Sequence, residues 1–182
     1  GYLDTDGDGI REMPDGSRPL TFRMNWPSSD TTAPRMAEIL AETWGQAGVT
    51  LEMQAVESDA LTAQCCPTLD FDIILWGWGS DPDPNLLLGV QTTAEIPTGY
   101  NETGYSNPEF DALYDQQATE LDLETRKELV WKMQEIAFND VVYIIPYYEQ
   151  SVQAYRTDRF TGWLTEFPKI ELSDVTSLVV IE

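Results

Sequence analysis

The fold of this chain is decided by residues 20–56, which read LTFRMNWPSSDTTAPRMAEILAETWGQAGVTLEMQAV. Apolar and polar side chains alternate from Leu20 to Trp26 and again over 49–56, and a period of two is typical of strands with one covered face. Between these stretches, apolar residues over 32–46 recur at helical spacing. The order strand, helix, strand predicts an α/β unit whose sheet is at least partly parallel.

The same kind of pattern continues toward the carboxyl end of the chain. It predicts a short helix over 59–64, a third strand over 71–76 and two helices that start after Asn107 and Asp122, since both residues are favoured N-caps. Two further strands are expected, over 141–148 and 151–155. We therefore expect the α/β class, with a mixed sheet and flanking helices.

Length and charge limit the classes of function. The 182 residues suffice for one domain or one lobe of a larger protein. The net charge of −22, from 32 acidic and 10 basic residues, opposes binding to nucleic acid and to anionic lipid. No apolar run approaches the roughly 18 residues of a membrane span, so we expect no membrane-spanning segment.

Catalytic motifs are missing from the sequence. The chain has no histidine, which removes imidazole as a base, proton shuttle or metal ligand. A nucleophile elbow, a phosphate-binding loop and a dinucleotide fingerprint are also absent. We therefore predict that the protein is not an enzyme, and we keep a carboxylate-based hydrolase acting through Asp81 and Asp83 as a minor alternative.

The two cysteines, Cys65 and Cys66, are neighbours in the sequence. Two adjacent residues are too few and too close for a metal site. They could form a vicinal disulfide or remain thiols, and the specific geometry that a disulfide needs favours thiols.

An acidic loop near the amino terminus, residues 4–15, has the spacing of an EF-hand calcium loop. Oxygen ligands fall at the expected positions, except that an aspartate replaces the usual final glutamate. No helix is predicted on either side, so calcium would stabilise the loop rather than switch a conformation. The alternative is an acidic surface loop without metal. The predicted ligands, with the main-chain carbonyl of the isoleucine, are Asp4, Asp6, Asp8, Ile10, Glu12 and Asp15.

A second candidate site follows the third predicted strand. In open α/β sheets, ligands bind beyond the carboxyl ends of the strands. Aromatic rings there offer flat apolar walls, and a carboxylate can anchor an ammonium group or hydroxyls. A tryptophan after a buried strand is, however, commonly part of the core. The predicted ligand-binding residues are Trp76, Trp78, Asp81 and Asp83.

Several blocks, in this order, resemble the family 5 extracellular solute-binding proteins. They are DTDGDGIRE at 4–12, GWGSDPDP at 77–84, YSNPEFDAL at 105–113 and IPYY at 145–148. This family contains the oligopeptide-, dipeptide- and nickel-binding components of ABC importers. The resemblance implies a periplasmic-binding-protein-like fold and a receptor that captures peptides or similar small solutes for the permease subunits of an ABC transporter.

The resemblance also implies how the chain is used. Residues 1–182 would form the carboxy-terminal lobe of a two-lobed protein, with the tail over 157–182 crossing toward the other lobe. Asp81 would hold the amino terminus of a peptide beside Trp78. The loop is one residue shorter here than in several peptide-binding relatives, which leaves oligosaccharides open as ligands.

Location and cofactors follow from the same comparison. The receptor would be periplasmic or extracellular, with a lipid anchor carried outside this chain. It would need no cofactor other than a structural calcium ion in the acidic loop. The alternative from another class is a calcium-stabilised carbohydrate-binding or adhesion module.

Overall fold

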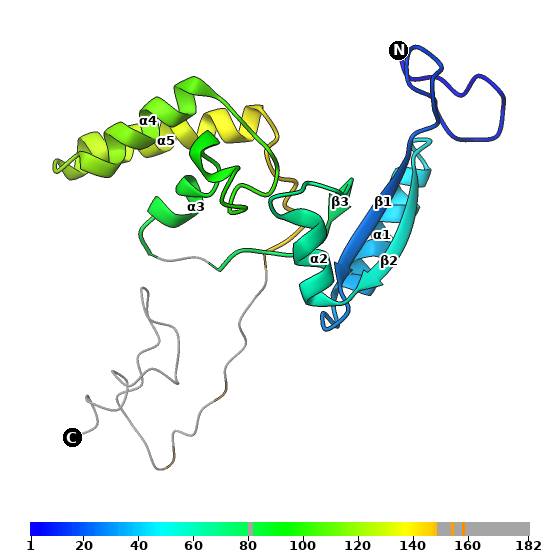
Figure 1. Ribbon diagram of the computed structural model, residues 1–182, viewed down its shortest axis with the longest axis horizontal. Coiled ribbons are helices and arrows are strands. Elements are labelled where there is room, and N and C mark those ends of the chain that lie inside the picture. The colour runs from blue at the N-terminus through cyan, green and yellow to red at the C-terminus, as the bar shows by residue number, and fades with distance from the viewer. Residues whose placement is uncertain (80–81, 149–153, 155–157, 159–182) are drawn as a thin grey trace. The chain divides into compact units, whose positions relative to one another are not determined.

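The computed structural model describes residues 1–79, 82–148, 154 and 158 (Figure 1). The chain divides into two compact units, Gly1–Val142 and Tyr143–Glu182, and all helices and strands described below lie in the first. The predicted ligand residue Asp81 lies outside the described residues. The same holds for the tail over 157–182, apart from Asp158, and for most of the strand predicted over 151–155.

A three-stranded parallel sheet forms the first part of this unit, in the order β2-β1-β3. Strands β1 (Thr21–Pro27) and β2 (Thr50–Val56) pair along their whole lengths, so that Phe22 lies beside Leu51. Both strands were predicted, and the α/β class is confirmed. Every strand pair in the described part of the chain is parallel.

Helix α1 (Ala33–Gly45) connects β1 to β2 and covers one face of the sheet. The carboxylate of Asp30 accepts the N–H groups of Thr32 and Ala33 at the start of the helix. Gly48 has a φ of +79°, which glycine adopts without strain, and its carbonyl accepts the N–H of Arg11. The buried residues between α1 and the sheet are Met24, Trp26, Ala33, Ala37 and Leu51.

Helix α2 (Ser58–Cys65) leads to strand β3, which is limited to Ile73–Ile74. The prediction of a strand over 71–76 was therefore too long. The reason is visible at Asp72, whose carboxylate accepts the N–H of Arg23 in β1 at 2.8 Å. The side chain of Asp72 thus accepts the main-chain N–H that a carbonyl of a longer β3 would accept. The pairing of β1 with β3 therefore begins only at Ile73.

The remaining elements form a helical layer. They are α3 (Asn85–Gly89), the 3-10 helix η1 (Thr93–Glu95), α4 (Pro108–Thr119) and α5 (Leu123–Asn139). Asn107 and Asp122 cap α4 and α5 through their side chains, as predicted. The buried core between these helices consists of Leu88, Phe110, Val130 and Met133.

The prediction of a strand over 141–148 is wrong. Helix α5 runs to Asn139, and the N–H of Val142 bonds back to the carbonyl of Ala137. Val141 has a φ of +52°, so the chain leaves the helix through a turn. A run of apolar residues predicts a strand only where a partner strand lies beside it, and none pairs with these residues in the described part of the chain.

Candidate functional site

The acidic loop gathers four of the carboxylates that the sequence singled out. Ligand oxygens of Asp4, Asp6, Asp8 and Glu12 all lie within 4.8 Å of one another. Asp4 accepts the N–H groups of Gly7 and Gly9, and Glu12 accepts the N–H of Thr5 at 2.8 Å. These bonds curl the loop so that its acidic side chains converge.

The other two predicted ligands behave differently. Asp15 lies outside this group, and its carboxylate accepts the N–H of Ser17 at 3.0 Å. Hydrogen bonding by Ser17 lowers the pKa of Asp15 below its ordinary value. The main-chain carbonyl of Ile10 stays a predicted ligand. The main-chain N–H of Ile10 donates a hydrogen bond to the carboxylate of Asp8. Four carboxylates at this separation suit a hard divalent cation, and calcium binding itself stays a prediction.

Trp76 and Trp78 follow β3 on an extended segment, where the sequence placed them. Trp76 is half-buried, whereas Trp78 is 37% exposed. The indole Nε1 of Trp78 donates a hydrogen bond of 2.9 Å to the carboxylate of Glu102. The ring of Tyr100 lies beside that of Trp78, with a centroid distance of 6.2 Å. We call Trp78, Tyr100 and Glu102 the aromatic site.

Glu102 and Tyr100 were not predicted as site residues. They lie in the irregular stretch between η1 and α4, more than 20 positions from Trp78 in the printed sequence. In a chain with 32 acidic residues, one more glutamate carries no signal. Its burial could have been suspected only from its neighbours, a run of aromatic, glycine and asparagine residues typical of a structured loop.

Asp83 is held by an ion pair inside the helical layer. Its two carboxylate oxygens accept hydrogen bonds from Arg126 at 2.7 and 2.8 Å. These bonds, with the N–H of Asn85, lower the pKa of Asp83 to about 2. The buried side chain of Gln117 joins the network, since its oxygen accepts from Arg126 and its nitrogen donates to Asn85.

This arrangement gives Asp83 a structural role in fixing α3 against α5. Ligand contact by Asp83 stays a prediction, as does ligand contact by Trp76. The anchoring role of Asp81 cannot be placed, because Asp81 lies outside the described residues. Of the two predicted tryptophans, Trp78 is the more exposed.

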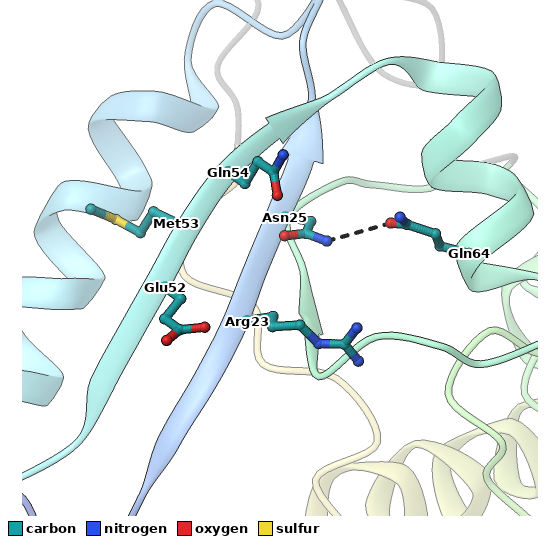
Figure 2. A pocket seen from close by; sticks show the side chains of 6 residues that line it. All are labelled: Arg23, Asn25, Glu52, Met53, Gln54 and Gln64. Atoms are coloured by element: carbon teal, nitrogen blue, oxygen red, sulfur yellow. Dashed lines mark hydrogen bonds between the residues drawn. The ribbon is translucent and has the colours of Figure 1, made fainter.

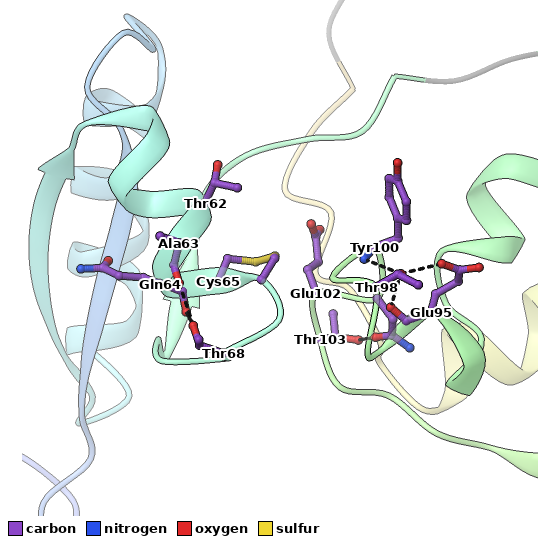
Figure 3. Close-up of a disulfide and its surroundings, with 12 residues drawn as sticks. Thr62, Ala63, Gln64, Cys65, Thr68, Glu95, Thr98, Tyr100, Glu102 and Thr103 are labelled. Atoms are coloured by element: carbon purple, nitrogen blue, oxygen red, sulfur yellow. Dashed lines mark hydrogen bonds between the residues drawn. A yellow bond between two sulfur atoms is a disulfide. The ribbon is translucent and has the colours of Figure 1, made fainter.

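The two cysteines form a disulfide in the structure (Figure 3). The expectation of two thiols was therefore wrong. Cys65 is the last residue of α2, and Cys66 follows it into a tight turn in which Leu69 has a positive φ. The disulfide lies close to Glu102, whose carboxylate is within 4.8 Å of both sulfur atoms. It therefore borders the aromatic site.

The sheet face opposite α1 is polar and carries a pocket of about 430 Å³ (Figure 2). Asn25 of β1 donates to Gln64 of α2 across it, at 3.5 Å. Neighbouring strands place Glu52 beside Arg23 and Gln54 beside Asn25. Sequence reasoning did not find this pocket, because it is the polar half of an alternating pattern. The residues that line it are Arg23, Asn25, Glu52, Met53, Gln54 and Gln64.

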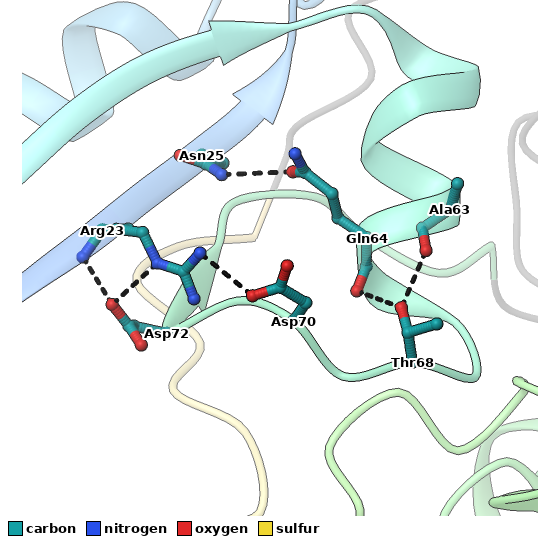
Figure 4. Close-up of polar contacts among 7 residues, drawn as sticks. All are labelled: Arg23, Asn25, Ala63, Gln64, Thr68, Asp70 and Asp72. Atoms are coloured by element: carbon teal, nitrogen blue, oxygen red, sulfur yellow. Dashed lines mark hydrogen bonds and ion pairs between the residues drawn. The ribbon is translucent and has the colours of Figure 1, made fainter.

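One rim of this pocket is fixed by ion pairs (Figure 4). Arg23 contacts Asp70 at 3.1 Å and Asp72 at 3.2 Å. Burial acts to raise the pKa of Asp72, but the N–H and guanidinium group of Arg23 outweigh it and hold that pKa below its ordinary value. The pairs join β1 to the segment before β3, and because their side chains are largely exposed, each pair contributes only a little to stability.

An α/β unit with an exposed aromatic site beyond a strand end has the layout of a ligand-binding protein. The family model described as "Bacterial extracellular solute-binding proteins, family 5 Middle" matches residues 1–95. The chain belongs to this family of extracellular solute-binding proteins, as its sequence blocks indicated. A search of curated proteins found no match.

Solved structures of binding proteins share the fold of this chain. The oligopeptide-binding protein AppA from Bacillus subtilis, in complex with a nonapeptide, is 26% identical with a TM-score of 0.69, over 79% of this chain and 28% of that one. A periplasmic oligopeptide-binding protein from Thermotoga maritima, with mannohexaose bound, is 23% identical with a TM-score of 0.74, over 90% of this chain and 31% of that one.

A third structure shares the fold. NikA from Brucella suis, in complex with Fe(III)-EDTA, is 23% identical with a TM-score of 0.64, over 79% of this chain and 28% of that one. The chain thus spans less than a third of the length of each of these proteins. Among the described residues, no helix is both long and apolar enough to cross a membrane.

Proposed function

We propose that this chain is the carboxy-terminal lobe, residues 1–182, of a two-lobed receptor that captures peptides or similar small solutes for an ABC importer. The observation that carries the proposal is the aromatic site, where Trp78 is exposed beyond β3 yet held by Glu102. Family membership over residues 1–95 and the likeness to AppA support it.

The role that we propose is binding without catalysis. The family consists of solute-binding proteins, and the similar structures are binding proteins as well. These comparisons support the receptor rather than an adhesion module. The proposal includes Asp81 as the anchor of a peptide's amino terminus, permease subunits as partners, and an extracytoplasmic location with a lipid anchor outside this chain.

Peptides are the ligand class that we propose first, because the relative with the highest identity among those described above was crystallised with a peptide. Oligosaccharides are the second class, since the Thermotoga protein was crystallised with mannohexaose. Both present flat or apolar surfaces that can stack on an exposed indole ring.

We also propose that Asp4, Asp6, Asp8 and Glu12 bind a structural calcium ion. Their convergence within 4.8 Å supports this, because a divalent cation would offset the repulsion among four carboxylates. The ion would stabilise the loop that precedes β1 and take no part in solute binding.

A thermal-shift screen of the complete receptor tests the function. Short peptides, oligosaccharides and calcium are added separately, and the screen is repeated with Asp81→Ala. Stabilisation by peptides that disappears in the variant supports a receptor that anchors an amino terminus. Stabilisation by sugars that survives the substitution keeps the receptor and changes its solute. Stabilisation by neither class contradicts the proposed function.

A further inference from the structure

The indole of Trp78 has a buried hydrogen-bond acceptor. Glu102 is only 6% exposed, and its carboxylate accepts the Nε1–H group of Trp78 at 2.9 Å. Hydrogen bonds to a carboxylate are stronger than those between neutral groups, and away from water they hold a side chain more firmly. This bond therefore restricts the rotamer of a ring that is otherwise 37% exposed.

A second ring stands beside the first. Tyr100 is 56% exposed, and its plane makes an angle of 44° with that of Trp78 at a centroid distance of 6.2 Å. The rings belong to separate segments, since Trp78 follows β3 and Tyr100 follows η1. Their tilt gives an aromatic wall with two faces, broader than one indole alone.

The segment that carries Tyr100 and Glu102 is itself anchored. Asn101 between them is 1% exposed, and its side-chain nitrogen donates to the carbonyls of Thr92 and Tyr105. Gly99 has a φ of +86°, and a Cβ atom there would lie 3.1 Å from the Cβ of Cys66. The segment is thus fixed from both sides, and one of its contacts is the Cys65–Cys66 disulfide (Figure 3).

We propose that Glu102 is a positioning residue of the solute site, which holds the indole of Trp78 beside Tyr100. The resulting wall selects solutes that present a flat apolar surface, such as an aromatic side chain or the apolar face of a sugar ring. Glu102 acts through Trp78 and need not contact the solute. The selection of solutes rests on the proposed function, whereas the positioning of Trp78 does not.

The positioning is tested directly in the complete receptor without any ligand. Exchange of the indole N–H with solvent is followed by NMR in the ¹⁵N-labelled protein, and the Trp78 signal is assigned with Trp78→Phe. In Glu102→Leu we expect this exchange to be about 10-fold faster, because the acceptor is lost. Glu102→Gln keeps an acceptor oxygen, so its exchange should stay within about twofold of wild type.

Two controls separate positioning from unfolding. The other tryptophan signals should keep their positions in Glu102→Leu, and Glu135→Leu, at an exposed position on α5, should leave Trp78 unchanged. Equal exchange rates in wild type, Glu102→Leu and Glu102→Gln would overturn the proposal. So would loss of the fold in Glu102→Gln, since a conservative change would then be structural.

Solute selection is tested by titration calorimetry with a nonapeptide and with mannohexaose as probes. For a probe that the wild type binds, affinity should fall about 10-fold in Glu102→Leu and by less than about twofold in Glu102→Gln. Unchanged affinity in Glu102→Leu would refute the role in selection. If wild type binds no member of either ligand class, the proposed function fails, while the exchange experiment still decides whether Glu102 positions Trp78.

Discussion

The acidic loop and the aromatic site hold their carboxylates by different means. In the loop, the ligand oxygens of Asp4, Asp6, Asp8 and Glu12 lie within 4.8 Å of one another. Asp4 accepts main-chain N–H groups, and Glu12 accepts both the N–H and the hydroxyl group of Thr5. In the aromatic site, Glu102 accepts a hydrogen bond from the indole of Trp78. In the helical layer, Asp83 pairs with Arg126. The difference is one of partners. The contacts of the loop carboxylates described above come from neutral groups of the loop itself, so binding of a cation there stays a prediction, whereas a carboxylate partner distant in sequence holds the indole of Trp78.

The largest expected effect is that of calcium on the loop. At a free calcium concentration about 100-fold above the dissociation constant, the free energy of unfolding of the complete receptor should rise by about 2.7 kcal/mol. In Asp4→Asn most of this gain should be lost, because one of the converging charges is removed. Without calcium and at low salt, the stability of the same variant should stay within about 1 kcal/mol of wild type, because the loss of one of the two N–H bonds that Asp4 accepts is offset by the decrease in repulsion. If calcium raised the free energy of unfolding equally in wild type and in Asp4→Asn, the predicted calcium site would be contradicted.

A smaller effect on stability is expected at the aromatic site. Glu102→Ala should lower the free energy of unfolding by about 2 kcal/mol, because a partly buried indole N–H loses its acceptor. Thermal denaturation of the complete receptor measures this, with Glu102→Gln as the matched control. Addition of calcium should leave the difference unchanged. A difference that calcium abolishes would mean that the two regions are coupled.

The ion pair of Asp83 provides a pH test. Its pKa is lowered to about 2 from an ordinary value of 3.8, so its stabilisation is present above about pH 4 and is lost as pH falls through about 2. Since the Asp83 side chain is 54% exposed, we expect Asp83→Asn to cost only about 1 kcal/mol at neutral pH. Denaturation at several pH values should show the two proteins converging near pH 2. A difference that stays constant into acid would rule out the ion pair as its cause.

The smallest effect is expected at Asp15, which shares the sequence pattern of the loop but not its cluster. Asp15→Asn removes the same charge as Asp4→Asn and keeps an acceptor for the Ser17 N–H. The melting temperature should not change measurably, with or without calcium. A calcium response reduced as strongly as in Asp4→Asn would show that Asp15 is a ligand after all.

The features that could be predicted from the sequence are the local ones. Asn107 and Asp122 cap helices because a cap needs only the next few residues. Strands β1 and β2 follow from alternation, and Asp4, Asp6, Asp8 and Glu12 converge because their spacing sets a tight turn. The position of Trp78 after a strand also follows from the sequence pattern, and its contact with a solute stays a prediction.

The features that were missed depend on residues distant in sequence. The partnership of Glu102 with Trp78 joins two segments whose meeting no local pattern predicts. Strand β3 is short because Asp72 bonds to Arg23, 49 positions away. Thiols were expected for Cys65 and Cys66 because a disulfide needs a specific geometry. The structure instead has a disulfide between them, in the tight turn at the end of α2.

The central claim, that solute binds against Trp78, is tested most directly by a ligand titration of the ¹⁵N-labelled complete receptor. The account predicts that the indole signal of Trp78 shifts most among those of the six tryptophans in residues 1–182. Trp131, 61% exposed on α5, serves as the internal control and should not move. Saturable binding that shifts other indole signals and leaves Trp78 in place would contradict the account.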